Sequence, residues 1–395
     1  MSLQCREDRV LYCGDGGILA TQTKHLSVAV LAVALSGATL QASPAGQAQP
    51  GSGEPSRPLE QQGFQSFYSL DYDSAIAAFQ KLRDAEPENA SWQNHLANAY
   101  LFKQLHLAKA LQGNLFGSSN LFFRVKKIQP DPALEKGFRD ANQAAIRLCD
   151  QRLKQNRKDE EALYACGVAY GARASYQGLI ERAKLDSISN ARKANVYHSE
   201  LIRLNPRCYD AYLVPGLYEY VLGSLPGSLK FLLLMVGFSG DKERGIHSIE
   251  STAQMGERSK QDAKILLSVI YRREKRYADA RRTLEELAQE FPRNYIFPLE
   301  VASVNEIAGE DKEAIRGYEQ VLVEMRDGKP GFADAPAARI HYELGQLYFK
   351  SGNLESAKAH FDQVPGSAGT SPELDKQSDE MRRQIDEALR QKQPG

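Results

Sequence analysis

The chain has 395 residues, of which 42% are hydrophobic and 25% are charged, and its 50 Lys and Arg balance its 50 Asp and Glu. This composition is typical of a water-soluble globular protein, and the zero net charge excludes a strongly basic nucleic-acid-binding protein. No apolar stretch approaches the roughly 18 residues of a membrane span, which excludes a polytopic membrane protein, and the length allows two or three domains or one long repeat array.

Residues 1–48 are predicted to be an N-terminal extension that ends in a signal peptide. The apolar run Leu26–Leu35 is followed by small residues at Ser36–Ala38 and again at Gly46–Ala48, both of which fit a cleavage site. The run is too short to span a bilayer, so the pattern predicts an exported protein of the periplasm or cell envelope. Residues 49–58 are rich in Gly, Pro and Ser and are predicted to be a flexible linker.

A repeated helical pattern fills residues 59–370, where alternating strand patterns are missing. Registers that begin at Gln261 and Tyr295 lie 34 residues apart, and registers from Ser56 and Ala338 show the same spacing of small and large apolar residues. A fixed period of this length is the mark of a repeat architecture.

Each position in the repeat has a physical reason. Small residues at two positions, Gly63 with Ala75 and Gly345 with Ala357, let two helices approach closely. Large apolar residues between them fill the space from one hairpin to the next. A proline such as Pro292 ends the second helix, because it lacks the amide hydrogen and clashes with the preceding turn.

The pattern resembles the tetratricopeptide repeat family, whose unit is a helix–turn–helix of 34 residues. The resemblance implies an all-α fold, a right-handed superhelix (an α-solenoid) of about six helical hairpins. We expect insertions at about 113–132 and 222–241, and long helices at about 133–156 and 160–180. Residues 371–395 are predicted to form a capping helix and tail, because a solenoid needs a polar-faced terminal element.

A second resemblance covers residues 206–256. The turn Leu225-Pro226, the apolar stretch Leu229–Val236 and the sequence Gly237–Asp241 before Gly245 are similar to a stretch of the tetratricopeptide repeat protein 39 family, which includes a yeast mitochondrial outer-membrane protein linked to inclusion clearance. This resemblance implies common descent of that module only.

Two apolar segments leave an alternative open. The segment Leu229–Phe238 is apolar on all sides, so we expect it inside the superhelix. Leu121–Lys127 mixes aromatic residues with three cations, and we expect its aromatic residues in the core. The alternative is that both segments dock on a membrane, which would make the chain a peripheral membrane-associated envelope protein.

The five cysteines do not form a metal-binding or multi-disulfide pattern. Cys5 and Cys13 precede the signal-like run, which leaves Cys149, Cys166 and Cys208 in the mature chain. We expect these three to be small buried residues on helices. An oxidising compartment would allow one bridge, either Cys149–Cys166 or Cys166–Cys208.

Sequence motifs for catalysis are missing, so the chain is predicted to be neither an enzyme nor a carrier of a metal or cofactor. It has no glycine-rich phosphate loop, no dinucleotide fingerprint and no zinc-protease motif. Gly237-Phe-Ser-Gly240 falls short of a nucleophile elbow, because Asp241 stands where the last glycine is needed. The histidines are scattered, and His341 and His360 lie on different helices of one hairpin without acidic residues at metal-ligand spacing.

The predicted function is that of a non-catalytic scaffold that binds a protein or peptide partner, and no nucleic acid, in its concave groove. The resemblance implies that the first helix of each repeat lines this groove. Aromatic anchors with a few arginines are what binding hot spots use, although several of these side chains would equally fit packing against neighbouring helices. The predicted groove residues are Phe64, Phe67, Tyr68, Asn94, Asn98, Phe102, Leu217, Tyr220, Arg272, Arg273, Tyr342, Gln346, Phe349 and Lys350.

Overall fold

The computed structural model describes residues 56–111, 128–225, 227, 230, 235 and 239–392. These residues form fifteen α-helices and no strand, so the prediction of an all-α solenoid is confirmed. The predicted signal peptide, residues 49–55 of the predicted linker, the segment Leu121–Lys127 and nearly all of Leu229–Phe238 lie outside the described residues. Residues 56–58, which were predicted to belong to the linker, form the start of helix α2.

Helices of the N-terminal half pack in chain order, each against the next. A π-helical turn (Gln177–Glu181) separates the fifth helix from the sixth, and a 3-10 turn (Tyr209–Tyr212) precedes the seventh. The helices are α2 (Ser56–Tyr68), α3 (Tyr72–Ala85), α4 (Ala90–Leu107), α7 (Pro132–Gln155), α8 (Glu160–Tyr176), α9 (Lys184–Leu204), α10 (Leu213–Gly223) and α12 (Lys242–Met255).

The C-terminal half follows the predicted registers closely. Three hairpins, α13–α14, α15–α16 and α17–α18, begin near Gln261, Tyr295 and Ala338, and the predicted capping helix is α19, which packs on α18. The helices are α13 (Lys260–Arg273), α14 (Tyr277–Glu290), α15 (Ile296–Ala308), α16 (Asp311–Arg326), α17 (Ala337–Lys350), α18 (Leu354–Gln363) and α19 (Pro372–Lys392).

The close approach of paired helices depends on the small residues of the repeat. A Cβ atom added at Gly63 would lie 2.6 Å from the Phe79 ring of α3, and one added at Gly345 would lie 2.8 Å from the Phe361 ring of α18. Side-chain caps set the helix starts, as where Asp71 accepts a hydrogen bond from the Ser74 amide and satisfies one free donor of α3.

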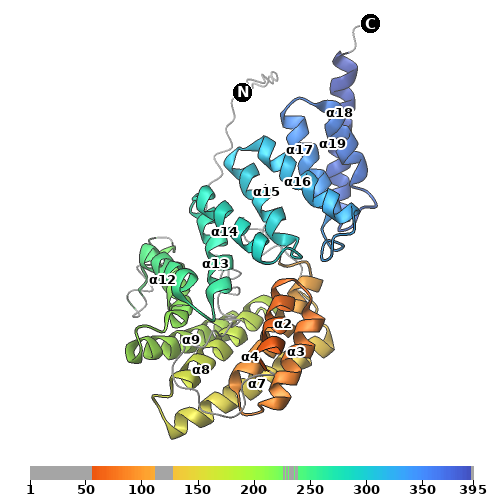
Figure 1. Cartoon of the computed structure of the whole chain (residues 1–395). Helices are drawn as coiled ribbons and strands as arrows, with labels where there is room; N and C mark the ends of the chain where they lie inside the picture. The colour runs from red at the N-terminus through yellow and green to blue at the C-terminus, as the bar shows by residue number, and fades with distance from the viewer. Residues whose placement is uncertain are drawn as a thin grey trace, which may run out of the picture.

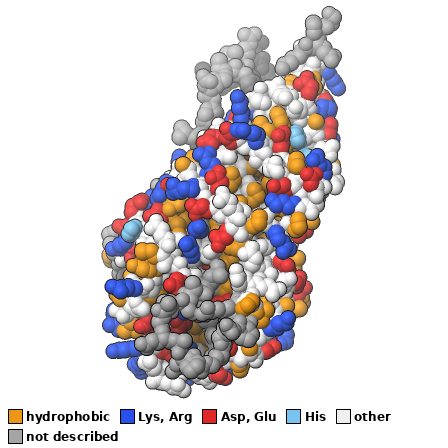
Figure 2. Space-filling model, viewed as in Figure 1, with side chains coloured by type: hydrophobic (Ala, Val, Ile, Leu, Met, Phe, Trp, Pro, Cys, Tyr) orange, Lys and Arg blue, Asp and Glu red, His pale blue; other side chains and the backbone are white. Residues whose placement is uncertain are grey.

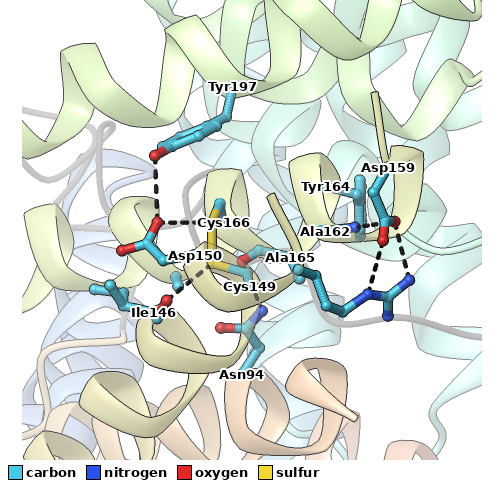
Figure 3. Close-up of a disulfide and its surroundings, with 12 residues drawn as sticks. Asn94, Ile146, Cys149, Asp150, Asp159, Ala162, Tyr164, Ala165, Cys166 and Tyr197 are labelled. Carbon is cyan, nitrogen blue, oxygen red and sulfur yellow. Dashed lines mark hydrogen bonds and ion pairs between the residues drawn. A yellow bond between two sulfur atoms is a disulfide. The ribbon is translucent and has the colours of Figure 1, made fainter. Parts of the chain in front are cut away.

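A buried disulfide joins α7 to α8 (Figure 3). It links Cys149 and Cys166, whose Cα atoms lie 5.5 Å apart. The structure thus selects one of the two bridges that the sequence allowed, and both of its cysteines are buried on helices as expected. Cys208 carries a free thiol, half-buried in the turn after α9 rather than on a helix.

The solenoid curls so that its first hairpin meets the hairpin α13–α14, about 200 residues later in the chain. Helices α2–α9 form a compact lower body, α15–α19 extend from it as an arm, and α13 and α14 lie between them (Figure 1). We call the contacts of α2 with α13 and with the loop Phe291–Asn294 the junction. There Tyr68 donates a hydrogen bond to Asp262 (3.0 Å), and Asn294 donates one to the Tyr68 carbonyl (2.7 Å).

One continuous hydrophobic core runs through this body and across the junction, from Phe64 in α2 to Val304 in α15. Tyr68 and Phe291, whose rings meet at the junction, both belong to it.

Candidate functional site

Half of the predicted groove residues are buried among the helices. Asn94 shows why: its side chain donates a hydrogen bond (2.9 Å) to the carbonyl of Ala165 in α8, beside the disulfide (Figure 3). Tyr220 donates to Glu274 (3.0 Å), and the Phe64 and Phe79 rings meet edge to face. The buried members of the set are Phe64, Phe67, Tyr68, Asn94, Asn98, Leu217 and Tyr220.

The remaining predicted residues are half-buried or exposed. Phe102 and Arg272 lie at the junction, and Arg273 follows at the end of α13. Gln346 donates a hydrogen bond to the Tyr342 hydroxyl (2.7 Å), and Lys350 forms an ion pair with Asp311 (2.7 Å). Phe349 packs beside the cluster that joins α17 and α18 to α19. Whether these residues hold a partner stays a prediction.

The junction contains an apolar pocket of about 110 Å³. Helices α2, α4, α13 and α15 contribute its walls, and four of the predicted groove residues, Phe67, Tyr68, Phe102 and Arg272, line it. Leu70 and Val269, which also line it, are only half-buried, so the pocket opens to the surface.

Polar groups at the rim of this pocket are already bonded to other protein groups. Arg272 donates to Glu300 (2.9 Å) and to Ser303 (3.2 Å). Tyr68 is bonded to Asp262, and burial together with this carboxylate raises the pKa of Tyr68 well above its usual value, so the phenol stays protonated. A pocket whose polar groups are satisfied internally offers a ligand mainly apolar contact.

Among the described residues, several titratable groups have pKa values that burial shifts. Burial lowers the pKa of His95 to about 3 and that of His198 to about 4, so both imidazoles are neutral at pH 7. Burial raises the pKa of Glu343 to about 7 against the opposing charge of Arg339. These shifts arise from desolvation in the core rather than from a shared cleft.

Within the described part of the chain, one group of three metal-type ligand residues comes together: Cys149, Asp150 and Cys166. The two sulfur atoms are bonded to each other and are not free to bind an ion. Cys208 is a poor nucleophile, because burial raises the pKa of its thiol to about 11.

Charged side chains of both signs are interspersed on the visible face of the molecule. On the face in Figure 2, acidic and basic side chains alternate over both the body and the arm. Among the helices of residues 56–111 and 128–392 that the structure describes, none has the length and the apolar content that crossing a membrane requires.

Sequence reasoning missed the junction. The predicted groove set contains Tyr68 but neither Asp262 nor Asn294, the two residues that bond to it at the junction. The hydrogen bonds join residues 194 and 226 positions apart, and the repeat pattern encodes only neighbouring contacts.

Comparison with known families finds the repeat directly. Two tetratricopeptide repeat models match the chain, one at residues 338–364 and the other at residues 67–112 and 265–330. These matches cover α3 and α4 and most of the three hairpins α13–α14, α15–α16 and α17–α18. They overlap the registers that begin at Ser56, Gln261, Tyr295 and Ala338. No curated protein matches the sequence.

Solved structures with similar folds include a tetratricopeptide repeat protein from Parabacteroides merdae, at 16% identity and a TM-score of 0.32 over 84% of this chain and 99% of that one. The tetratricopeptide repeat domain of P58(IPK) has 17% identity and a TM-score of 0.28, over 86% and 99%. Yeast Tom70 has 12% identity and a TM-score of 0.27, over 86% and 90%.

Proposed function

We propose that this chain is an exported, non-catalytic scaffold that binds a protein or peptide partner along its C-terminal repeats and anchors it with one apolar side chain in the junction pocket. The tetratricopeptide repeats support a role in protein interaction. The single observation that carries the anchor is the apolar pocket whose rim groups are already paired.

The size of the pocket sets the kind of anchor. An apolar cavity of about 150 Å³ binds one benzene molecule. A pocket of about 110 Å³ therefore suits one leucine- or phenylalanine-sized side chain and is too small for a long acyl chain. A rigid apolar anchor surrounded by near-neutral contacts is the usual form of a binding hot spot.

Filling the pocket tests the proposal. Val269 lines it and is half-buried, so Val269→Trp should occupy the space with an indole ring while leaving far-UV circular dichroism unchanged. Loss of one buried apolar anchor, worth about 1.5–3 kcal/mol, should weaken binding of peptides selected on the wild-type chain by roughly 10- to 100-fold.

The matched control is Val196→Trp on the exposed face of α9, outside the pocket, which should leave the affinity unchanged. Selected peptides that bind Val269→Trp as tightly as the wild type would contradict the anchor.

Two observations support export. The apolar run Leu26–Leu35 has the form of a signal peptide, and a buried disulfide joins Cys149 to Cys166. Disulfides form and persist in oxidising compartments such as the periplasm. Fusion of residues 1–58 to alkaline phosphatase, which is active only after export, should give an active reporter, and a fusion lacking Leu26–Leu35 should not.

A second candidate function is peripheral membrane association, and the exposed stripe of α9 favours it. Leu185, Ile188 and Val196 are 83%, 56% and 57% exposed on one side of this helix, next to the cations Arg192 and Lys193. Apolar side chains beside cations suit an anionic lipid surface.

Flotation with vesicles of phosphatidylglycerol and phosphatidylcholine separates the two functions. A scaffold alone should stay in the soluble fraction. A membrane-associated chain should float with the vesicles, lose this on Leu185→Ser with Ile188→Ser, and keep it on the control Leu107→Ser, an exposed leucine of α4.

We also propose that residues 206–256 descend from the same module as the tetratricopeptide repeat protein 39 family. The match of Leu225-Pro226 and Gly237–Asp241 to that family supports this descent, and it carries no cellular role to this chain.

A further inference from the structure

Two histidines of the last repeat face each other with their ring nitrogens. His341 of α17 and His360 of α18 are 19 positions apart in sequence, and their Nδ1 atoms lie 3.1 Å apart. The ring centroids are 5.3 Å apart, so the two nitrogens point almost directly at each other. In this form one Nδ1–H donates a hydrogen bond to the other Nδ1.

The separation of the two nitrogens matches that of two ligands on one metal ion. Imidazole nitrogens bind Zn²⁺ at about 2.0–2.1 Å, so two of them around a tetrahedral or square-planar ion lie roughly 2.9–3.4 Å apart. The observed 3.1 Å falls within this range. The lone pairs converge on one ion when the His341 ring tilts. Both rings are half-buried rather than enclosed, so water reaches the remaining coordination positions.

One proton lies between the two nitrogens, on the Nδ1 atom that donates the hydrogen bond. For both Nδ1 atoms to bind one ion, this proton moves to Nε2 of the same ring. Both Nδ1 lone pairs are then available to the ion, and no proton is lost from the pair.

Neighbouring groups hold one of the rings in place. Tyr348 stacks on His360 with the planes 7° apart, and its hydroxyl donates a hydrogen bond (2.6 Å) to Glu319 of α16. The Glu319 carboxylate also adds negative charge near His360, which favours a cation there. Outer groups of this kind orient metal ligands.

We propose that His341 and His360 form a binding site for a late first-row transition-metal ion, Cu²⁺, Ni²⁺ or Zn²⁺, that cross-links α17 to α18. Imidazole ligands select these ions over Mg²⁺ and Ca²⁺, and Cu²⁺ should bind most tightly. The site lies in the last repeat and is separate from the junction pocket, so it stands independently of the proposed scaffold function.

Copper binding to the full chain tests the site. Titration with CuCl₂ followed by electron paramagnetic resonance should show one Cu²⁺ with two nitrogen ligands. His341→Asn and His360→Asn should each weaken this binding roughly a hundredfold, because the second ligand no longer acts at high effective concentration. The matched control is His247→Asn, an exposed histidine of α12, which should change nothing.

A second measurement needs no variant. Zn²⁺ should protect His341 and His360, but not His247, from modification by diethyl pyrocarbonate, as read by mass spectrometry. Mg²⁺ at the same concentration should protect none of them. The proposal is overturned if both variants bind Cu²⁺ like the wild type, or if Zn²⁺ gives the pair no protection.

Discussion

Glu343 is a buried carboxyl group on α17 whose ion-pair partner, Arg339, is itself half in solvent. Burial raises the pKa of Glu343 from 4.5 to about 7, and the nearby Glu306 adds to this effect. A raised folded-state pKa means that the native state holds the proton more tightly than the unfolded chain does. The resulting stability is complete below pH 4.5 and is lost as the pH rises through about 7.

Replacing Glu343 with Gln removes this loss. The free energy of unfolding of Glu343→Gln minus that of the wild type should be larger at pH 8 than at pH 5, by up to roughly 3 kcal/mol. Urea unfolding at the two pH values measures it. The control is Glu355→Gln, at an exposed position, which should show no such pH-dependent gain. If Glu343→Gln differs from the wild type in free energy of unfolding by the same amount at both pH values, the raised pKa of Glu343 is contradicted.

Arg272 shows how a correct position can have a different role. The repeat register places it on the inner face, and it does line the junction pocket. Its side chain is only 10% exposed, however, and is bonded to Glu300 and Ser303. Charge reversal at Arg272 would place two carboxylates together, so it would disturb the junction rather than report on a partner.

At the scale of single elements, the hairpins could be predicted because their signals are local. Gly63 and Gly345 mark close helix contacts, and such spacing recurs within each unit. The end of α8 was less predictable. The helix expected at about 160–180 changes to a π-helical turn at Gln177–Glu181. It ends at Arg182, whose φ of 61° lies outside the helical region. No residue type in this segment signals the change.

The disulfide between α7 and α8 was left open by the sequence, because cysteine spacing does not reveal which helices pack together. It closes a loop with a sequence separation of 17 residues. In the chain-entropy account, a loop of this size stabilises the native state by about 3 kcal/mol. We expect Cys149→Ala with Cys166→Ala to lower the free energy of unfolding by about that amount, measured by urea unfolding.

Cys208→Ala is the matched control for the disulfide and should change the free energy of unfolding little, since its thiol is unpaired and half-buried. Both bridged sulfurs are buried, so reductant should act on the wild type only after it unfolds. A double variant as stable as Cys208→Ala would show that the bridge adds nothing.

At the scale of the whole molecule, the junction turns the N-terminal repeats into a closed body. The sequence could not predict this, because closure depends on small rotations accumulated over many repeats. Groove residues inferred from the repeat register, such as Phe64, Asn98 and Tyr220, also lie in the core, and Phe64 packs there on Phe79 and His95 of the next two helices. Register positions near the arm, such as Gln346 and Lys350, remain accessible.

Breaking the junction should open the body. Tyr68→Ala with Asn294→Ala removes the bonds to Asp262 and to the Tyr68 carbonyl, together with the ring contact to Phe291. We expect a larger radius of gyration in small-angle X-ray scattering at nearly unchanged helicity. Tyr342→Ala on the arm is the control, and an unchanged radius for the double variant would show that other contacts suffice.

The junction also governs the order in which the chain reaches its final state. A simple repeat array completes each unit as soon as its neighbour is made. Here the ribosome releases α2 first, yet Asn294, which bonds to Tyr68, lies 226 positions later. At a translation rate of about 5–20 residues per second, roughly 10–45 seconds pass between the synthesis of α2 and that of Asn294. During this interval the apolar side of the first hairpin is exposed, and a chaperone that binds α2 would have its largest effect then.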